Sequence, residues 1–80
     1  MHMTRTPLDI IRDVFQEDVA ELKDDFDLRE LPNWDSLNHM NFVAAIEREY
    51  EVTLTGDEIA DMLTLKTITT ILAENHAVSL

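Results

Sequence analysis

The chain has 80 residues, with 17 acidic and 6 basic side chains that give a formal net charge of −11, and it contains no cysteine. This length predicts one small domain, residues 1–80, with a single core and no deep catalytic cleft. The absence of cysteine excludes disulfides, thiolate metal sites and cysteine nucleophiles. The acidic charge argues against nucleic acid and anionic membranes as partners and favours partners with basic docking patches.

No apolar stretch of the sequence predicts a membrane anchor. The longest uninterrupted apolar run extends from Phe42 to Ile46, which is too short to cross a bilayer. Residues 1–5 lack the apolar run of a signal peptide. We therefore expect a soluble, cytoplasmic monomer without membrane insertion, with residues 1–5 and 75–80 frayed.

The first predicted helix opens at Thr6, which suits the N-cap position, and Pro7 suits the first helical position. Asp9 lies three residues after the cap, where its negative charge favours the helix dipole. Apolar residues at helical spacing form one broad face: Leu8, Ile10, Ile11, Val14 and Phe15. Because Val19 and Leu22 could continue this face, we expect the helix to end between Gln16 and Leu22.

Residues 23–35 predict a long ordered loop, anchored by three apolar side chains: Phe26, Leu28 and Leu31. Asp25 and Asp27 have the spacing of the first two carboxylates of a calcium-binding loop. The rest of that motif does not follow, because Arg29 takes the fifth position and Ser36 replaces the bidentate glutamate. The sequence therefore predicts no metal site.

The second predicted helix covers residues 36–50 and begins at Asp35-Ser36, with Asp35 in the N-cap position. Ser36 lies in the exposed first turn, where free backbone N–H groups and the positive end of the helix dipole favour a phosphate. The apolar spacing predicts a broad core stripe: Leu37, Met40, Val43, Ala44 and Tyr50, widened by Phe42, Ala45 and Ile46.

Three glutamates cluster at the other end of this helix: Glu47, Glu49 and Glu51. The C-terminal end of a helix disfavours negative charge, and Arg48 only partly offsets it. This placement favours a role in binding rather than in stability.

Two further helices are predicted after the short extended link at residues 52–54. Thr55 with Glu58 forms a capping box for a small helix, and Thr64 caps a last helix that frays after Glu74. Three threonines near residues 67–70 also suit a strand, but no partner strand is predicted, so helix is favoured. The predicted fold is all-α, an antiparallel bundle of three main helices and one short helix.

A resemblance to a known family begins with the run Trp34-Asp35-Ser36-Leu37, which precedes an amphipathic helix that ends at Ala45-Ile46-Glu47-Arg48-Glu49-Tyr50. Together these segments resemble acyl carrier proteins. Residues 55–59 and 64–68 are similar to the third helix of that family and to the entry of its fourth. The resemblance covers the chain in the right order and implies a carrier and not a catalyst.

The resemblance implies that a phosphopantetheinyl transferase, using coenzyme A and magnesium, esterifies Ser36 with 4′-phosphopantetheine. The thiol of this arm then holds an acyl or aminoacyl group as a thioester for loading and transferring enzymes. Asp35 is expected to cap the helix and mark the site, and Leu37 to lie beside the arm against the partner enzyme. The family's recognition positions correspond to three further residues: Met40, Glu47 and Glu49.

The chain also departs from fatty-acid carriers of this family. It has Pro32-Asn33-Trp34 where those carriers usually have a glycine, and Asn38 and Asn41 where they have acidic residues. The front half of the recognition helix is therefore nearly neutral. These differences favour a dedicated stand-alone carrier from a specialised pathway, such as natural-product assembly, aminoacyl transfer or surface-polysaccharide modification, over bulk fatty-acid synthesis.

The sequence leaves two alternatives to a carrier. A catalytic arrangement of Ser36 with His39 and Asp35 is disfavoured, because all three lie on one exposed turn without residues for an oxyanion hole. His39 is instead expected to be solvated beside the arm. The other alternative is a small acidic interaction domain without a prosthetic group, in which Ser36 is only structural. Trp34 either braces the loop or contributes to a partner-facing surface.

Overall fold

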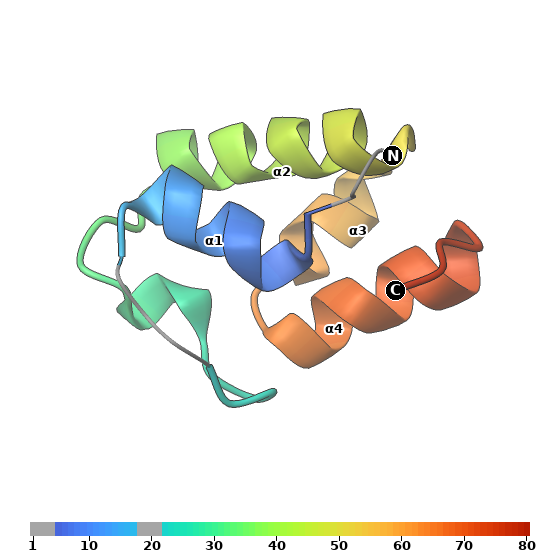
Figure 1. Cartoon of the computed structure of the whole chain (residues 1–80). Coiled ribbons are helices and arrows are strands. Elements are labelled where there is room, and N and C mark those ends of the chain that lie inside the picture. The colour runs from blue at the N-terminus through green and yellow to red at the C-terminus, as the bar shows by residue number, and fades with distance from the viewer. Residues whose placement is uncertain (1–4, 18–21) are drawn as a thin grey trace.

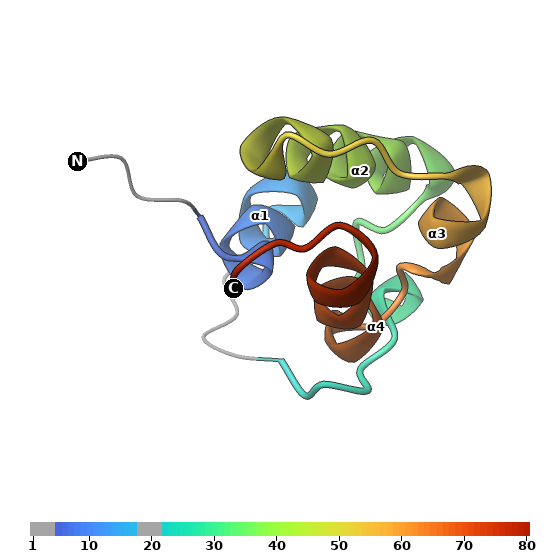
Figure 2. The same cartoon turned by 90° about the vertical axis from the view of Figure 1, so that its right-hand side faces the viewer.

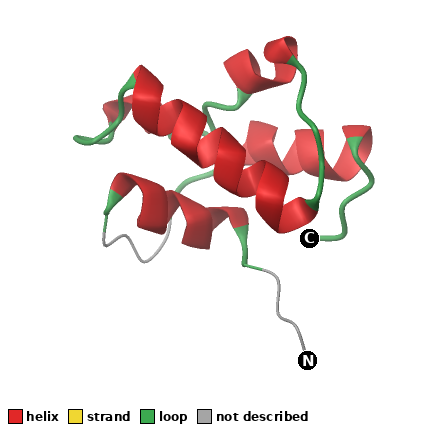
Figure 3. Cartoon of the chain, turned by 90° about the horizontal axis from the view of Figure 1, so that it is seen from above, coloured by secondary structure: helices red, strands yellow, loops and turns green. Residues whose placement is uncertain are grey.

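The computed structural model describes residues 5–17 and 22–80 and contains only helices over these residues (Figures 1 and 3). The elements are α1 (Pro7–Phe15), the 3₁₀ turn η1 (Leu28–Glu30), α2 (Ser36–Tyr50), α3 (Gly56–Asp61), α4 (Leu65–Thr70) and the π turn η2 (Ile71–Asn75). The prediction of an all-α bundle is confirmed. None of the helices in this part of the chain is long and apolar enough to cross a membrane.

Helix α1 begins as predicted but ends earlier than predicted. Thr6 and Asp9 form a reciprocal capping box, in which the Asp9 N–H donates to the Thr6 hydroxyl at 3.1 Å. The helix ends at Phe15 because Gln16 adopts the left-handed conformation, with φ of 54°, and its N–H returns to the Arg12 carbonyl. The predicted continuation through Val19 lies outside the described residues.

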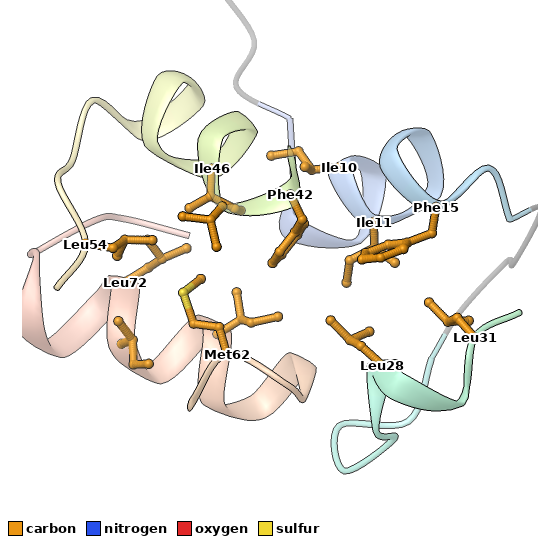
Figure 4. Close-up of a cluster of buried hydrophobic side chains, with 13 residues drawn as sticks. Ile10, Ile11, Phe15, Leu28, Leu31, Phe42, Ile46, Leu54, Met62 and Leu72 are labelled. Carbon is orange, nitrogen blue, oxygen red and sulfur yellow. The ribbon is translucent and has the colours of Figure 1, made fainter. Parts of the chain in front are cut away.

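Helix α1 lies between α2 and α4 and packs against both (Figure 1). The short helix α3 lies at one side of the bundle, between α2 and α4 (Figure 2). The core between these helices is formed by side chains with no exposed surface, among them Phe15, Phe42 and Met62 (Figure 4). The rings of Phe15 and Phe42 are tilted with centroids 6.0 Å apart, so they join α1 to α2.

The bounds of α2 are confirmed, and the predicted core stripe is right in part: Val43, Phe42 and Ile46 are buried, but the prediction is wrong for Leu37, Met40 and Ala44. The buried residues of α2 are His39, Phe42, Val43 and Ile46. Leu37 is 71% exposed, Met40 is 50% exposed, and Ala44 is also exposed. The buried residues and the exposed residues both have helical spacing. The buried ones are those that face the apolar side of α1.

The loop before α2 is ordered by its apolar anchors and by main-chain contacts. Leu28 and Leu31 are buried as predicted, and the turn η1 forms between them. The Leu28 N–H donates to the Leu63 carbonyl at 2.8 Å, and the Lys66 N–H donates to the Asp24 carbonyl at 3.0 Å. These two bonds attach the loop to the junction of α3 and α4.

The predicted caps of the last two helices are confirmed at Thr55 and Thr64. Beyond η2 the chain folds back, and the Val78 N–H donates to the Leu72 carbonyl at 2.9 Å. His76 Nε2 lies 2.9 Å from a carboxylate oxygen of Glu58. These contacts attach the end of the chain to η2 and α3, and the fraying of residues 75–80 stays a prediction. Residues 1–4 lie outside the described part.

Candidate functional site

The candidate site is the N-terminus of α2, where Asp35 is the N-cap as predicted. Its backbone is extended, with φ of −154°, and its Oδ1 accepts from the Asn38 N–H at 2.7 Å. Ser36 is the first residue of the helix and is exposed. The N–H groups of Ser36 and Leu37 have no acceptor within the described chain, as is usual for the first turn of a helix.

The loop that carries Asp35 is fixed to its surroundings by hydrogen bonds. The Asn33 side chain donates to the Phe15 carbonyl at 2.8 Å, and the Asn38 side chain donates to the Asn33 carbonyl at 2.8 Å. The Trp34 N–H donates to the Leu31 carbonyl at 3.0 Å. No local pattern around Asn33 signals this role, because its hydrogen-bond partner lies 18 residues away.

Trp34 and His39 lie on the inner side of the site. Trp34 is half-buried and packs against the core, so it braces the loop. His39 is only 8% exposed, which contradicts the prediction that it is solvated. Its Nε2–H donates to the Ile59 carbonyl at 2.9 Å, which ties α2 to α3. The hydrogen bond to Ile59 and the burial of the ring give His39 a structural role between α2 and α3, and no hydrogen bond joins its ring to the exposed Ser36 hydroxyl within the described residues.

The outer side of the first half of α2 is apolar or neutral. The exposed residues that follow Ser36 on this surface are Leu37, Met40, Asn41 and Ala44. Helix α2 has no acidic residue in its first turn, although the chain has a net charge of −11. Leu37 and Met40 therefore form an apolar surface next to the candidate attachment residue.

The two predicted recognition glutamates lie at the other end of α2 and bind groups of the chain itself. Glu47 Oε2 accepts from the Leu54 N–H at 2.9 Å. Glu49 accepts from the Arg5 N–H at 3.0 Å and from its Nε at 3.3 Å, and its side chain is only 15% exposed. The structure brings Asp35, Ser36, Leu37 and Met40 together at the N-terminal half of the helix, and places Glu47 and Glu49 apart from them.

The residues present at the site fit a phosphate ester. An exposed primary hydroxyl stands at the start of a helix of 15 residues, whose dipole and free N–H groups stabilise an anion. The Asp35 carboxylate is directed to the Asn38 N–H, which offsets part of its charge. No group of three or more metal-ligating side chains is found in residues 5–17 and 22–80.

Comparison with known proteins gives one match. A family model described as a phosphopantetheine attachment site matches residues 8–72, which include Asp35-Ser36 and all four α-helices apart from the first residue of α1. No curated protein and no solved structure matches the chain. Domains of the matched family carry 4′-phosphopantetheine covalently. The chain therefore belongs to the family of phosphopantetheine attachment domains, as an acyl-carrier-protein type of carrier domain.

Proposed function

We propose that Ser36 carries the 4′-phosphopantetheine arm, and that the protein holds acyl or aminoacyl groups as thioesters on this arm for partner enzymes. The observation that carries the proposal is the exposed Ser36 hydroxyl at the N-terminus of α2. The chain has two serines, and only Ser36 lies within the matched residues 8–72, since Ser79 follows them. The attachment chemistry requires a hydroxyl in this region.

The modification uses Ser36 as the nucleophile in an active site supplied by the transferase. The Ser36 oxygen forms a bond to the phosphorus of coenzyme A that carries the pantetheine, the bond to the nucleotide 3′,5′-bisphosphate breaks, and the hydroxyl proton passes to a base of the transferase. The new phosphodiester then lies beside the N–H groups of Ser36 and Leu37, which stabilise its charge. Once bound, the arm supplies the thiol that this cysteine-free chain lacks.

The rest of the proposal concerns partners. The exposed Leu37 and Met40 provide apolar contact area next to the arm for the transferase and for loading enzymes. Glu47 and Glu49 contribute to partner recognition only after they leave their present intramolecular contacts. The proposal assigns no catalytic residue to the chain, and it places the protein in the cytoplasm, as a dedicated carrier of a specialised pathway.

Intact-mass spectrometry tests the attachment residue. The protein is incubated with coenzyme A, magnesium and a phosphopantetheinyl transferase of broad specificity. The wild type and a Ser79→Ala control are expected to gain the mass of one arm, and Ser36→Ala is expected to gain none. If the wild type stays unmodified, the carrier proposal is wrong and a small acidic interaction domain without a prosthetic group is the better interpretation.

A further inference from the structure

Two buried polar atoms beneath the candidate site have no hydrogen-bond partner in the described part of the chain: Trp34 Nε1 and His39 Nδ1. The two rings are neighbours, with centroids 5.8 Å apart and planes inclined at 51°. A buried polar atom without a partner is rare in folded proteins, because it loses its hydrogen bonds to water on folding. Two such atoms side by side indicate a place that a polar group occupies.

The chemistry of the two atoms defines that group. His39 Nε2 faces the Ile59 carbonyl, which can only accept, so Nε2 carries the proton and Nδ1 of the neutral ring is an acceptor. The indole Nε1–H of Trp34 is a donor only. A group that satisfies both atoms must therefore accept one hydrogen bond from Trp34 and donate one to His39. A phosphate oxygen does not meet this requirement, because it cannot donate.

The simplest group that does both is a single oxygen atom that carries one hydrogen. The two rings are neighbours, with centroids 5.8 Å apart, so one small group can contact both of them. The donor and acceptor pair therefore fits a hydroxyl group or a water molecule.

The position of the pair relates it to Ser36. His39 lies three residues after Ser36 on the same helix, where side chains are about 5–6 Å apart at Cβ. Trp34 lies two residues before Ser36. A group joined to the Ser36 oxygen therefore needs only a few bonds to reach the pair. The pantetheine arm has one secondary hydroxyl, and this hydroxyl lies between its phosphodiester and its first amide.

Helix α3 provides the route to the pair. It is six residues long and contains no buried residue, and the Ile59 carbonyl on this helix accepts from His39. A short helix that buries little surface belongs to the least stable part of a fold, so it opens at low cost. Because the bond between His39 and Ile59 sets the acceptor role of Nδ1, α3 must close again over His39 once the arm is in place.

We propose that Trp34 Nε1 and His39 Nδ1 bind the secondary hydroxyl of the pantetheine arm, and so hold the first part of the arm against α2. This inference rests on the proposed attachment at Ser36. It assigns Trp34 and His39 a positioning role toward the arm in addition to their packing.

The single tryptophan makes the proposal directly measurable, because the ¹⁵N-labelled chain gives one indole N–H signal in a nuclear magnetic resonance spectrum. Three forms of the wild type are compared: unmodified, loaded with the natural arm, and loaded with an arm that lacks the hydroxyl, supplied as a deoxy analogue of coenzyme A. Intact mass confirms loading in each case. With the natural arm, we expect the indole signal to move downfield and the His39 Nδ1 signal to change relative to the deoxy form. We also expect hydrogen exchange of the indole N–H to slow by about two- to tenfold, the factor that one hydrogen bond provides.

The controls separate this proposal from the proposed attachment. Arg48→Ala, at an exposed position on the same helix, is expected to keep the difference between the two arms, and His39→Phe is expected to lose it. If both arms load and give the same indole signal and exchange rate, the pair is occupied by water only and the inference is wrong. If neither arm loads, the attachment proposal fails first and this inference fails with it.

Discussion

The side chain of Asn33 donates a hydrogen bond to the main-chain carbonyl of Phe15, 2.8 Å away, and thereby joins the end of α1 to the loop before Ser36. The last carbonyls of a helix have no partner inside the helix, so an external donor stabilises the helix end. The Asn33 carbonyl in turn accepts from the Asn38 side chain on α2. One residue therefore connects both helices that flank the loop.

Asn33→Ala is expected to lower the free energy of unfolding by about 1 kcal/mol, because it removes one intramolecular hydrogen bond. Urea denaturation measures the change. Asn41→Ala is the matched control, since its side chain is exposed and bonds Asn38 Oδ1 at a longer distance of 3.3 Å. The control should change stability by less than about 0.5 kcal/mol. Equal effects of the two variants would contradict the bridging role of Asn33.

Asp35 has a capping role that two substitutions distinguish from the role of its charge. Asp35→Ala removes the acceptor for the Asn38 N–H and should destabilise the fold by about 0.5–2 kcal/mol. Asp35→Asn keeps an oxygen acceptor and should cost only a few tenths of a kcal/mol. Thermal unfolding gives both values. If loading of the arm falls equally in both variants, the transferase depends on the carboxylate and not on the cap.

Leu28 and Leu37 allow the same substitution at a buried and an exposed position. Leu28 has no exposed surface, so Leu28→Ala should lower the free energy of unfolding by about 2–5 kcal/mol. Leu37 is 71% exposed, so Leu37→Ala should change stability by less than about 0.5 kcal/mol. A rate of arm loading that falls in Leu37→Ala without loss of stability would support partner contact at this residue. A stability loss in Leu37→Ala similar to that of Leu28→Ala would place Leu37 in the core after all.

The lowered pKa of Glu58 predicts that the folded protein loses stability in acid. The Thr55 N–H, the Asn75 side chain and His76 bond its carboxylate, and together they lower the pKa of Glu58 from 4.5 to about 2. The ionised form is therefore favoured by folding, so this contribution is complete above pH 4.5 and is lost as the pH falls toward 2. Unfolding measured over this range should show a steeper decline for the wild type than for Glu58→Gln. Identical pH profiles would mean that these contacts do not form in solution.

The raised pKa of Tyr50 predicts that the folded protein loses stability in base. Burial first, and then the charges of Glu49 and Asp9, raise the pKa of its phenol from 10.0 to about 12. The unfolded chain loses this proton at lower pH than the folded chain does, so stability should fall as the pH rises from 10 to 12. Tyr50 is the only tyrosine, so the ultraviolet absorbance of tyrosinate reports its titration. A midpoint near 10 in the folded protein would contradict the buried position of the ring.

The sequence was most informative where local chemistry decides the structure. Thr6, Asp35, Thr55 and Thr64 were predicted as N-caps, and all four are N-caps, because a cap depends on residues only three positions away. The start and end of α2 were also predicted correctly. The attachment residue was predicted from its resemblance to a family, and the match over residues 8–72 confirms the family but not the residue.

The sequence was least informative where contacts between distant residues determine which side chains are buried and where a helix ends. Leu37 and Met40 are three residues apart and Phe42 and Ile46 are four, and either spacing puts a pair on one face of a helix. Only the position of α1 determines which pair is buried. The burial of His39 depends on the Ile59 carbonyl, 20 residues away. The end of α1 depends on the left-handed conformation of Gln16, a residue type that does not signal this conformation.

Helix α2 places the chain's two best natural chromophores near its opposite ends. Trp34 lies just before Ser36, and Tyr50 is the last residue of the helix, so the two rings are separated by roughly 24 Å along its axis. Tyr50 also lines a shallow pocket with Arg5 and Leu80, far from the attachment residue. Emission from Trp34 therefore reports on the surroundings of Ser36, while the absorbance of Tyr50 reports on the opposite end of α2. The protein thus needs no added dye to reveal whether the two ends of this helix respond together or separately when a partner enzyme binds.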